Sequence, residues 1–334
     1  MRAVVQRGFG GTEQLSVREH PDPVPGEGEV LVRVRAAAVD RGTHHLLTGL
    51  PLVGRPYFGL RTPRFPVVGR DVAGTVVALG PGVSEYAVGD EVVGTADGSC
   101  AELAAVPVAR LARRPDGVPV EQAAAVPVSG LTALQALRKA HDGEGVRPGD
   151  RVLVLGASGG VGSHAVQLAA AAGAEVTGVC SAAKADLVRD LGAQRVLDYA
   201  RETPGADGTR WDVVVDLGGV RRLRDLRRTL ERDGTLVVAG GETEGRWTAG
   251  SHRQLLAALW SPFVSQRLVP LVSREDGADL AVLLDHVAAG RLRPAVDRTF
   301  TLEETAKALD HLAAGHVRGK AVITVSTAHA EEPS

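Results

Sequence analysis

The glycine-rich stretch RVLVLGASGGVGSHAVQLA, residues 151–169, restricts the fold more than any other part of this chain. An apolar run, a turn and a run of apolar residues at helical spacing predict a strand, a tight turn and a helix. The four glycines, Gly156, Gly159, Gly160 and Gly162, allow a close approach to a pyrophosphate, toward which the first N–H groups of the helix point. The turn is one residue longer than G-x-G-x-x-G, but its context predicts a dinucleotide site.

The residues that follow repeat this alternation of strand and helix. Apolar runs predict strands, and helical spacing predicts the helices between them; the strands are 151–156, 174–180, 194–199, 211–218 and 234–241, and the helices are 161–172, 183–193 and 223–234. Alternating units of this length are typical of a parallel, doubly wound sheet.

The first 120 residues have a different pattern. Short valine-rich runs such as EVLVRVRAAAV, residues 29–39, are separated by Gly, Pro and Asp, as in an antiparallel sheet. A chain of 334 residues is long enough for about two domains. We therefore predict an α/β protein with a doubly wound parallel sheet and a second, mainly antiparallel β domain.

Composition restricts the partners. The formal net charge of -2 provides no overall attraction to nucleic acid or to an anionic membrane. The arginine-rich stretch 220–234 also contains acidic residues at helical spacing, so we interpret it as a solvated helix face. Two cysteines form no disulfide framework, and no apolar run is long enough for a signal peptide or a membrane span, so we predict a cytoplasmic protein.

The end of the second predicted strand distinguishes NADPH from NADH. An NAD site places an acidic residue there, whereas this chain has Ser181 and Lys184 before its first acid, Asp186. A hydroxyl and an ammonium suit the 2′-phosphate of NADPH, although Lys184 also fits an exposed lysine at a helix start. Tyr199, after the third strand, fits either an adenosine contact or a half-buried strand tyrosine.

The sequence resembles the medium-chain dehydrogenase/reductases, in the zinc-free branch of quinone oxidoreductases and enoyl reductases. The resemblance covers essentially the whole chain in order, and it is carried by PGEGEVLVRVRAAAVD, VVGRDVAGTVVALGPGVSEYAVGDEVVG, AAAVPVSGLTALQAL, GASGGVG, GVCSAAKADLVRDLGAQRVLDY and GHVRGKAVITV. It implies a discontinuous GroES-like catalytic domain, residues 1–121 and 273–334, and a Rossmann NADPH-binding domain, residues 122–272. It also implies an active site in the cleft between them and a homodimer joined through the edges of the Rossmann sheets.

The resemblance also assigns roles to single residues. It implies pyrophosphate binding by Gly156 and by residues 158–161, and 2′-phosphate or adenosine contacts by Ser181, Lys184 and Tyr199. It places Thr132 near the nicotinamide ribose. The segments that would run past the nicotinamide are Ala239, Gly240 and Gly241, together with Phe263 and Val264; the pyrophosphate set is Gly156, Ser158, Gly159, Gly160 and Val161.

The stretch VDRGTHHLLTG, residues 39–49, departs from the family. Relatives usually have Asn where this chain has Asp40, and some quinone reductases have Tyr where His45 stands. Zinc-dependent relatives would place a cysteine near position 40, Gly-His-Glu near 70 and a cluster of four cysteines, none of which this sequence has. We expect no metal, although a zinc ion at His44 and His45 stays open as an alternative.

We therefore expect hydride transfer from NADPH to a quinone or an α,β-unsaturated carbonyl, where hydrogen-bond donors stabilise the enolate oxygen. The polar candidates on the substrate side are Asp40, His44, His45, Tyr57 and Thr132. Asp40 fits a base, an orienting acceptor or a simple helix cap, and solvent can provide the proton. The alternatives are a metal-free NADP-dependent alcohol or carbonyl dehydrogenase and a non-catalytic NADPH-binding protein. Residues 49–65 are expected to form a loop that walls the pocket.

Overall fold

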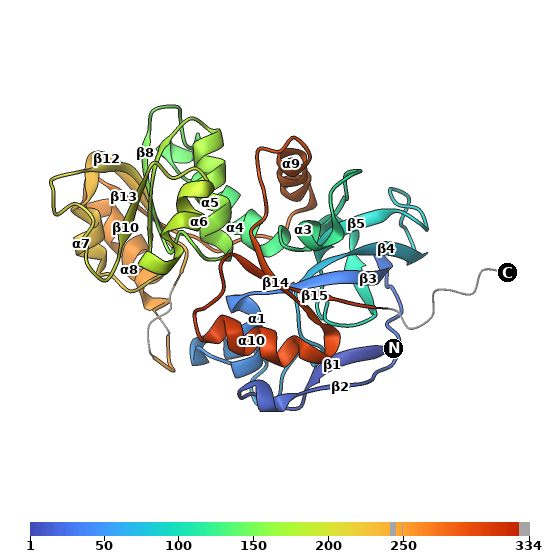
Figure 1. Ribbon diagram of the computed structural model, residues 1–334. Coiled ribbons are helices and arrows are strands. Elements are labelled where there is room, and N and C mark those ends of the chain that lie inside the picture. The colour runs from blue at the N-terminus through green and yellow to red at the C-terminus, as the bar shows by residue number, and fades with distance from the viewer. Residues whose placement is uncertain (241–244, 249, 327–334) are drawn as a thin grey trace.

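The computed structural model describes residues 1–240, 245–248 and 250–326, and its main feature is a pair of β-sheets in separate halves of the molecule (Figure 1). A six-stranded sheet has the order β10-β9-β8-β11-β12-β13, and a seven-stranded sheet has the order β14-β15-β3-β4-β5-β7. The predicted α/β class, with one doubly wound parallel sheet and one mainly antiparallel domain, is confirmed. The predicted domain boundaries stay a prediction.

The parallel sheet carries the glycine-rich turn at its carboxyl edge. Its strands are β8 (Arg151–Leu155), β9 (Glu175–Cys180), β10 (Arg195–Asp198), β11 (Trp211–Asp216), β12 (Leu230–Val238) and β13 (Arg267–Pro270). All of their pairings are parallel. The connecting helices are α5 (Gly160–Ala171), α6 (Ala185–Asp190), α7 (Leu223–Arg227) and α8 (His252–Trp260).

The second sheet is antiparallel except for the pair β14·β15. Its strands are β3 (Glu29–Val39), β4 (Asp71–Leu79), β5 (Glu91–Thr95), β7 (Leu111–Arg113), β14 (Val296–Thr301) and β15 (Lys320–Thr324), while β6 (Leu103–Pro107) pairs with β3. Strand β15 therefore lies beside β3, although the two are far apart in sequence (Figure 1). Both ends of the chain contribute to one domain.

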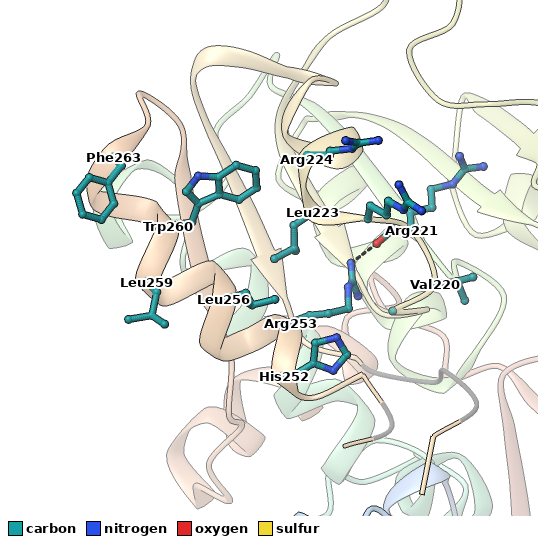
Figure 2. A pocket seen from close by; sticks show the side chains of 12 residues that line it. Val220, Arg221, Leu223, Arg224, His252, Arg253, Leu256, Leu259, Trp260 and Phe263 are labelled. Atoms are coloured by element: carbon teal, nitrogen blue, oxygen red, sulfur yellow. Dashed lines mark hydrogen bonds between the residues drawn. The ribbon is translucent and has the colours of Figure 1, made fainter. Parts of the chain in front are cut away.

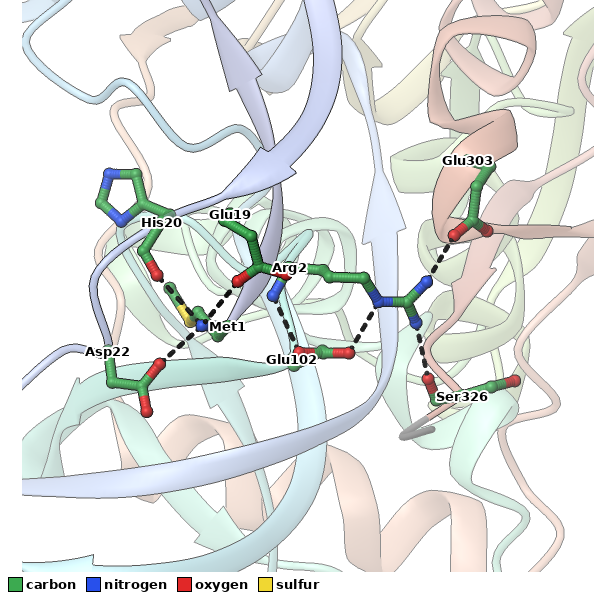
Figure 3. Close-up of polar contacts among 8 residues, drawn as sticks. All are labelled: Met1, Arg2, Glu19, His20, Asp22, Glu102, Glu303 and Ser326. Carbon is green, nitrogen blue, oxygen red and sulfur yellow. Dashed lines mark hydrogen bonds and ion pairs between the residues drawn. The ribbon is translucent and has the colours of Figure 1, made fainter. Parts of the chain in front are cut away.

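The N-terminal strands are joined to the same domain by charged side chains. Strand β1 (Arg2–Gln6) pairs with β2 (Leu15–Glu19). Figure 3 shows Arg2 between Glu102 and Glu303, with Nε 2.9 Å from a carboxylate oxygen of Glu102 and Nη1 2.9 Å from one of Glu303. Its remaining nitrogen donates to the carbonyl oxygen of Ser326 at 3.1 Å. Arg2 thus connects the first strand to residues near the last one.

Helices α4 (Pro127–Leu137) and α9 (Gly277–Ala288) pack where the two halves meet. A side chain at Gly130 of α4 would contact Leu283 of α9, and a side chain at Gly277 would overlap the carbonyl oxygen of Leu111 in β7. The glycine on each helix therefore permits a close approach, which fixes α9 between the parallel sheet's helices and the second sheet. The segment before α4 forms a separate short helix, α3 (Val120–Ala124).

Two predictions from the sequence are wrong in part. The helix predicted at 223–234 ends at Arg227, and β12 begins at Leu230. Leu230 pairs with Trp211 in the core, while Arg232 and Asp233 point to solvent, so the burial of Leu230 overrides the helical spacing of the arginines. The loop predicted at 49–65 contains a 3-10 helix, η2 (Leu52–Gly54), and the short helix α2 (Arg55–Phe58).

Candidate active site and cofactor site

The glycine-rich turn joins β8 to α5 with the geometry that an anion site needs. Gly156 has a φ of +84°, which a residue with a side chain rarely adopts, and Gly159 is the N-cap of α5. A side chain at Gly162 would overlap the carbonyl oxygen of Gly156 and the backbone of Ala157, so this helix can start close to the strand only with glycine there. The first N–H groups of α5, from Gly160 on, have no acceptor within the helix.

The same turn is tied to the last strand of the other domain. The N–H of Gly319 donates to the carbonyl oxygen of Ser158 at 2.9 Å, and Gly159 and Gly319 form a parallel bridge. A side chain at Gly160 would lie 3.0 Å from Cδ of Lys320 and 2.8 Å from Oγ of Ser129. The aliphatic part of Lys320 therefore passes directly against the start of α5.

A buried cluster of charges lies at the end of that lysine. Nζ of Lys320 is 2.6 Å from Oδ2 of Asp71 and 3.6 Å from Oδ2 of Asp40. The other oxygen of Asp71 accepts from the N–H of Val128, at the start of α4, at 2.7 Å. Burial opposes the charge on Lys320, but the carboxylates of Asp71 and Asp40 raise its pKa above the ordinary value. Burial raises the pKa of Asp71 to about 6, although Lys320 lowers it.

Asp40 is the N-cap of α1 (Arg41–Thr48), which is the cap alternative that the sequence left open. Its Oδ1 accepts from the backbone N–H of Thr43 at 2.9 Å and from the Thr43 hydroxyl at 3.1 Å. Its Oδ2 is buried without a hydrogen-bond partner and faces Lys320. Asp40 therefore sets the direction of α1 relative to the cluster that supports the glycine turn.

The two histidines are neighbours on α1 and therefore do not share a face of this helix. The ring centroids of His44 and His45 are 6.3 Å apart, and the ring planes are inclined by 71°. His44 is half-buried, and burial lowers its pKa below the ordinary value, with smaller effects from Arg41 and His45. Among the residues that the structure describes, no group of three or more His, Cys, Asp or Glu side chains is arranged to hold a metal ion.

The remaining substrate-side candidates lie on α4 and α2. The hydroxyl of Thr132 donates to the carbonyl oxygen of Val128 at 2.7 Å, which leaves its lone pairs available. Tyr57 on α2 is about half exposed, and its ring centroid is 5.7 Å from that of Phe65.

The segment 49–65 reaches across to the cofactor domain. The N–H of Leu52 donates to the carbonyl oxygen of Arg246 at 2.8 Å, and that of Val53 donates to Trp247 at 3.1 Å. Arg246 and Trp247 follow β12, whose carboxyl end lies at the same sheet edge as the glycine turn. The segment therefore spans the two domains at this edge.

The residues predicted at the adenosine end lie after β9 and β10. Ser181 precedes the 3-10 helix η5 (Ala182–Lys184), and the backbone N–H of Tyr199 donates to Cys180 at 3.1 Å, which brings Tyr199 beside this turn. Nζ of Lys184 donates to the carbonyl oxygens of Gly315 at 2.7 Å and Val317 at 2.8 Å. Burial lowers the pKa of Lys184 below its ordinary value.

The two segments predicted beside the nicotinamide lie toward opposite edges of the parallel sheet. Ala239 and Gly240 follow β12 and donate from their N–H groups to the carbonyl oxygen of Asp216, so they lie at the carboxyl edge with the glycine turn. Gly241 lies outside the described residues. Phe263 and Val264 precede β13, and because the strands are parallel, the structure places them toward the opposite edge. The residue that β13 brings to the carboxyl edge is Leu271, whose N–H donates to Val238.

Phe263 instead lines a pocket of about 730 Å³ on the outer side of the parallel sheet, between α8 and the residues after β11. Figure 2 shows Leu256, Leu259, Trp260 and Phe263 along one side and Arg224 on the other. The pocket's lining is Gly219, Val220, Arg221, Arg222, Leu223, Arg224, His252, Arg253, Leu256, Leu259, Trp260 and Phe263. Part of the arginine-rich stretch therefore borders an apolar pocket rather than only solvent.

Sequence reasoning missed the charged residues that are buried. Besides Asp71 and Lys320, Arg253 is buried and its Nη2 lies 2.6 Å from Oδ2 of buried Asp216 at the end of β11. The lysine at the start of the apolar strand KAVITV is the signal for Lys320, because a charge in a buried strand requires a partner.

Known proteins match this two-domain architecture over nearly the whole chain. Residues 26–116 match the profile of the alcohol dehydrogenase GroES-like domain, and residues 191–323 match that of a zinc-binding dehydrogenase. A chloroplastic quinone oxidoreductase of Triphysaria versicolor is 31% identical over 336 residues, which cover 97% of this chain and 98% of the relative. The structure of a quinone oxidoreductase from Coxiella burnetii is similar with a TM-score of 0.81 and 28% identity, over 98% of this chain and 99% of that one. A mycobacterial protein in complex with NADPH has a TM-score of 0.80 and 28% identity, over 97% of this chain and 100% of that one.

Proposed function

Because this chain belongs to the medium-chain dehydrogenase/reductases, in their zinc-free quinone oxidoreductase and enoyl reductase branch, and is therefore an oxidoreductase, we propose that it reduces a quinone or an enone with NADPH. The observation that carries this proposal is the glycine turn at the start of α5 together with the cation Lys184 beyond the end of β9. The turn suits a pyrophosphate, and the cation suits a 2′-phosphate.

The residues of the glycine turn, and those in and beside η5, fit NADPH. Gly160 and Val161 offer backbone N–H groups to the pyrophosphate, and the positive end of the α5 dipole favours the same anion. The N–H of Gly159 donates to the carbonyl oxygen of Gly156 at 3.1 Å, so this residue would serve the site by its lack of a side chain. Ser181, Lys184 and Tyr199 would hold the adenosine 2′-phosphate. When bound, NADPH supplies the hydride from its nicotinamide ring. Thr132, with its hydroxyl hydrogen directed at Val128, would accept a hydrogen bond from the nicotinamide ribose.

The histidines of α1 would provide the donors on the substrate side. His44 with its lowered pKa is neutral at pH 7, so one of its ring nitrogens carries a hydrogen that can bind a carbonyl oxygen. Such a donor stabilises the charge that develops on the oxygen when hydride reaches an enone or a quinone. Asp40 acts through α1 as a positioning residue, because its oxygens are directed at Thr43 and Lys320.

The proposed reaction uses no metal ion, and the donor set supports this. The buried ammonium of Lys320 lies 2.6 Å from Asp71 and 3.6 Å from Asp40, so a cation at these carboxylates would be repelled by it. His44 and His45 are neighbours on α1 and do not share a helix face, so they are poorly arranged to bind one ion together.

The proposal is tested by NADPH oxidation with matched panels of quinones, enones and aldehydes. Turnover of quinones or enones that survives dialysis against a chelator is the expected result. Turnover of aldehydes alone would instead indicate a metal-free alcohol or carbonyl dehydrogenase. Tight NADPH binding without oxidation by any acceptor would indicate a non-catalytic NADPH-binding protein.

We also propose that the enzyme is a homodimer joined along β13. This strand is the last in the parallel sheet, and the adjacent α8 and η6 (Ser261–Phe263) expose Leu259 and Phe263, which are 61% and 82% accessible. An exposed apolar face beside an open sheet edge favours association with a second copy. The double substitution L259E/F263E should convert a dimer to a monomer by light scattering; an unchanged mass would refute this interface.

The cytoplasm stays our proposed compartment. Both Cys100 and Cys180 are unpaired and buried, as expected in a reducing environment. No helix in the described part of the chain is long and apolar enough to cross a membrane.

A further inference from the structure

The turn after β9 and the segment before β15 hold each other by side chains that cross in both directions. Lys184 reaches from η5 to the carbonyl oxygens of Gly315 and Val317. Arg318 reaches back, and its Nη1 donates to the carbonyl oxygen of Ala183 at 3.0 Å. Two cations from different domains therefore lie at the place where the 2′-phosphate of NADPH is proposed to bind.

Arg318 also forms an ion pair with the acidic residue of this turn. Its Nη2 lies 2.8 Å from Oδ2 of Asp186, the one acidic residue in the stretch 181–186. An unpaired carboxylate here would repel a 2′-phosphate and would suit the ribose hydroxyls of NADH instead. The pairing with Arg318 removes that repulsion.

We propose that Arg318 is a cofactor-specificity residue: it neutralises Asp186 in the free enzyme and provides the second cation, beside Lys184, for the 2′-phosphate of NADPH. This inference rests on the proposed use of NADPH and adds to it a residue from outside the Rossmann domain.

The ion pair is easily rearranged when the phosphate arrives. The side chains of Arg318 and Asp186 are 37% and 68% accessible, and exposed pairs of this kind contribute little to stability. A phosphate has more negative charge than a carboxylate, and the planar guanidinium matches its geometry. Arg318 can therefore turn from Asp186 to the phosphate while its bond to Ala183 keeps it in place.

The charges around Lys184 support the same assignment. Burial lowers the pKa of Lys184, Asp297 raises it, and Arg318 lowers it again, so the two cations are close enough to repel each other. The carboxylate of Asp297 is already engaged by the ring of His311 at 2.7 Å. Lys184 uses two of its three hydrogens on carbonyl oxygens, and the third stays available to an anion.

The test measures binding of NADPH and NADH, and of adenosine 2′,5′-bisphosphate against 5′-AMP, by calorimetry on four proteins. These are the wild type, Arg318→Gln, Asp186→Asn and Lys307→Gln. Lys307 is an exposed lysine of α10 (Thr305–Ala313) whose substitution removes the same charge away from the site. The bisphosphate and 5′-AMP isolate the phosphate contact from the rest of the cofactor.

Arg318→Gln should weaken NADPH and the bisphosphate about tenfold, the contribution of one charge-assisted hydrogen bond, and leave 5′-AMP unchanged and NADH no weaker. Asp186→Asn should bind NADPH as tightly as the wild type or more tightly, and Lys307→Gln should match the wild type. Equal weakening of all ligands in Arg318→Gln would show that Arg318 only holds the turn, and an unchanged NADPH affinity would also refute its role. A wild type that prefers NADH would instead refute the proposed use of NADPH.

Discussion

Nζ of Lys320 lies 2.6 Å from Oδ2 of Asp71, and both side chains are almost completely buried. The two residues belong to β15 and β4, which are separated in the sheet by β3. Since the stem of Lys320 also passes the start of α5, this ion pair fixes the glycine turn relative to the second domain.

Removing one member of this pair should be more harmful than removing both. Lys320→Met leaves Asp71 buried without a cation, which should lower the free energy of unfolding by about 3 kcal/mol or more. The double variant D71N/K320M removes both charges and should recover a large part of that loss. Urea unfolding of the wild type, Lys320→Met, Asp71→Asn and the double variant measures the difference; a double variant less stable than either single one would contradict this account.

His164 should make stability depend on pH. It is buried in α5, its Nδ1 lies 2.8 Å from the carbonyl oxygen of Gly160, and burial lowers its pKa to about 4. Between about pH 6.5 and 4 the unfolded chain therefore binds a proton that the folded protein does not, so stability falls as the pH falls. From pH 7 to 5 this group should account for about 2 kcal/mol.

The variant His164→Asn isolates this effect. Asparagine retains a hydrogen-bond donor for Gly160 but does not titrate, so its unfolding free energy should fall less between pH 7 and 5 than that of the wild type. Parallel pH dependence in the two proteins would exclude His164 as the cause.

Two glycines of the turn should respond differently to alanine. A side chain at Gly162 would overlap Gly156, whereas one at Gly159 would lie 3.5 Å from the carbonyl oxygen of Gly156, an ordinary contact. Gly162→Ala should therefore lower both stability and NADPH affinity. Gly159→Ala should fold normally and lose affinity alone, because its methyl group would obstruct the approach of the pyrophosphate. Thermal unfolding and NADPH titration distinguish the two effects.

Lys184→Asp should weaken NADPH by well over tenfold while NADH changes little, because it replaces the proposed phosphate cation by an anion. Lys307→Asp is the matched control for the change of charge. Steady-state KM values for each cofactor provide the measurement. An equal rise of KM for NADPH and NADH would refute the assignment of Lys184 to the 2′-phosphate.

The histidine donor can be tested by comparing His44→Phe with His44→Gln. Phenylalanine removes the N–H, so kcat with an enone should fall by about tenfold to a thousandfold with little change in the affinity for NADPH. Glutamine retains an N–H donor and should restore part of the rate. A fully active His44→Phe would mean that His44 does not contact the substrate's oxygen.

Local signals made the parallel sheet and its glycine turn predictable, because strand, turn and helix are encoded within about 20 neighbouring residues. The buried cluster of Asp40, Asp71 and Lys320 could not be predicted in this way, since its members meet only when distant strands pair. The position of Phe263 depends on another kind of information: β13 begins after it, so the direction of this strand, and not proximity in sequence, decides which edge of the sheet Phe263 reaches.

The bridge between Gly159 and Gly319 has a consequence for the order in which the chain matures on the ribosome. Strands β8 to β13 can assemble as soon as residue 270 has emerged, but the strand that supports their glycine turn emerges later, at residue 320. Contacts between residues so distant in sequence form late in folding. If the proposed cofactor binds this turn, it therefore meets a fully supported site only after β15 has been synthesised, and it stabilises the chain at that stage rather than the earlier nascent one.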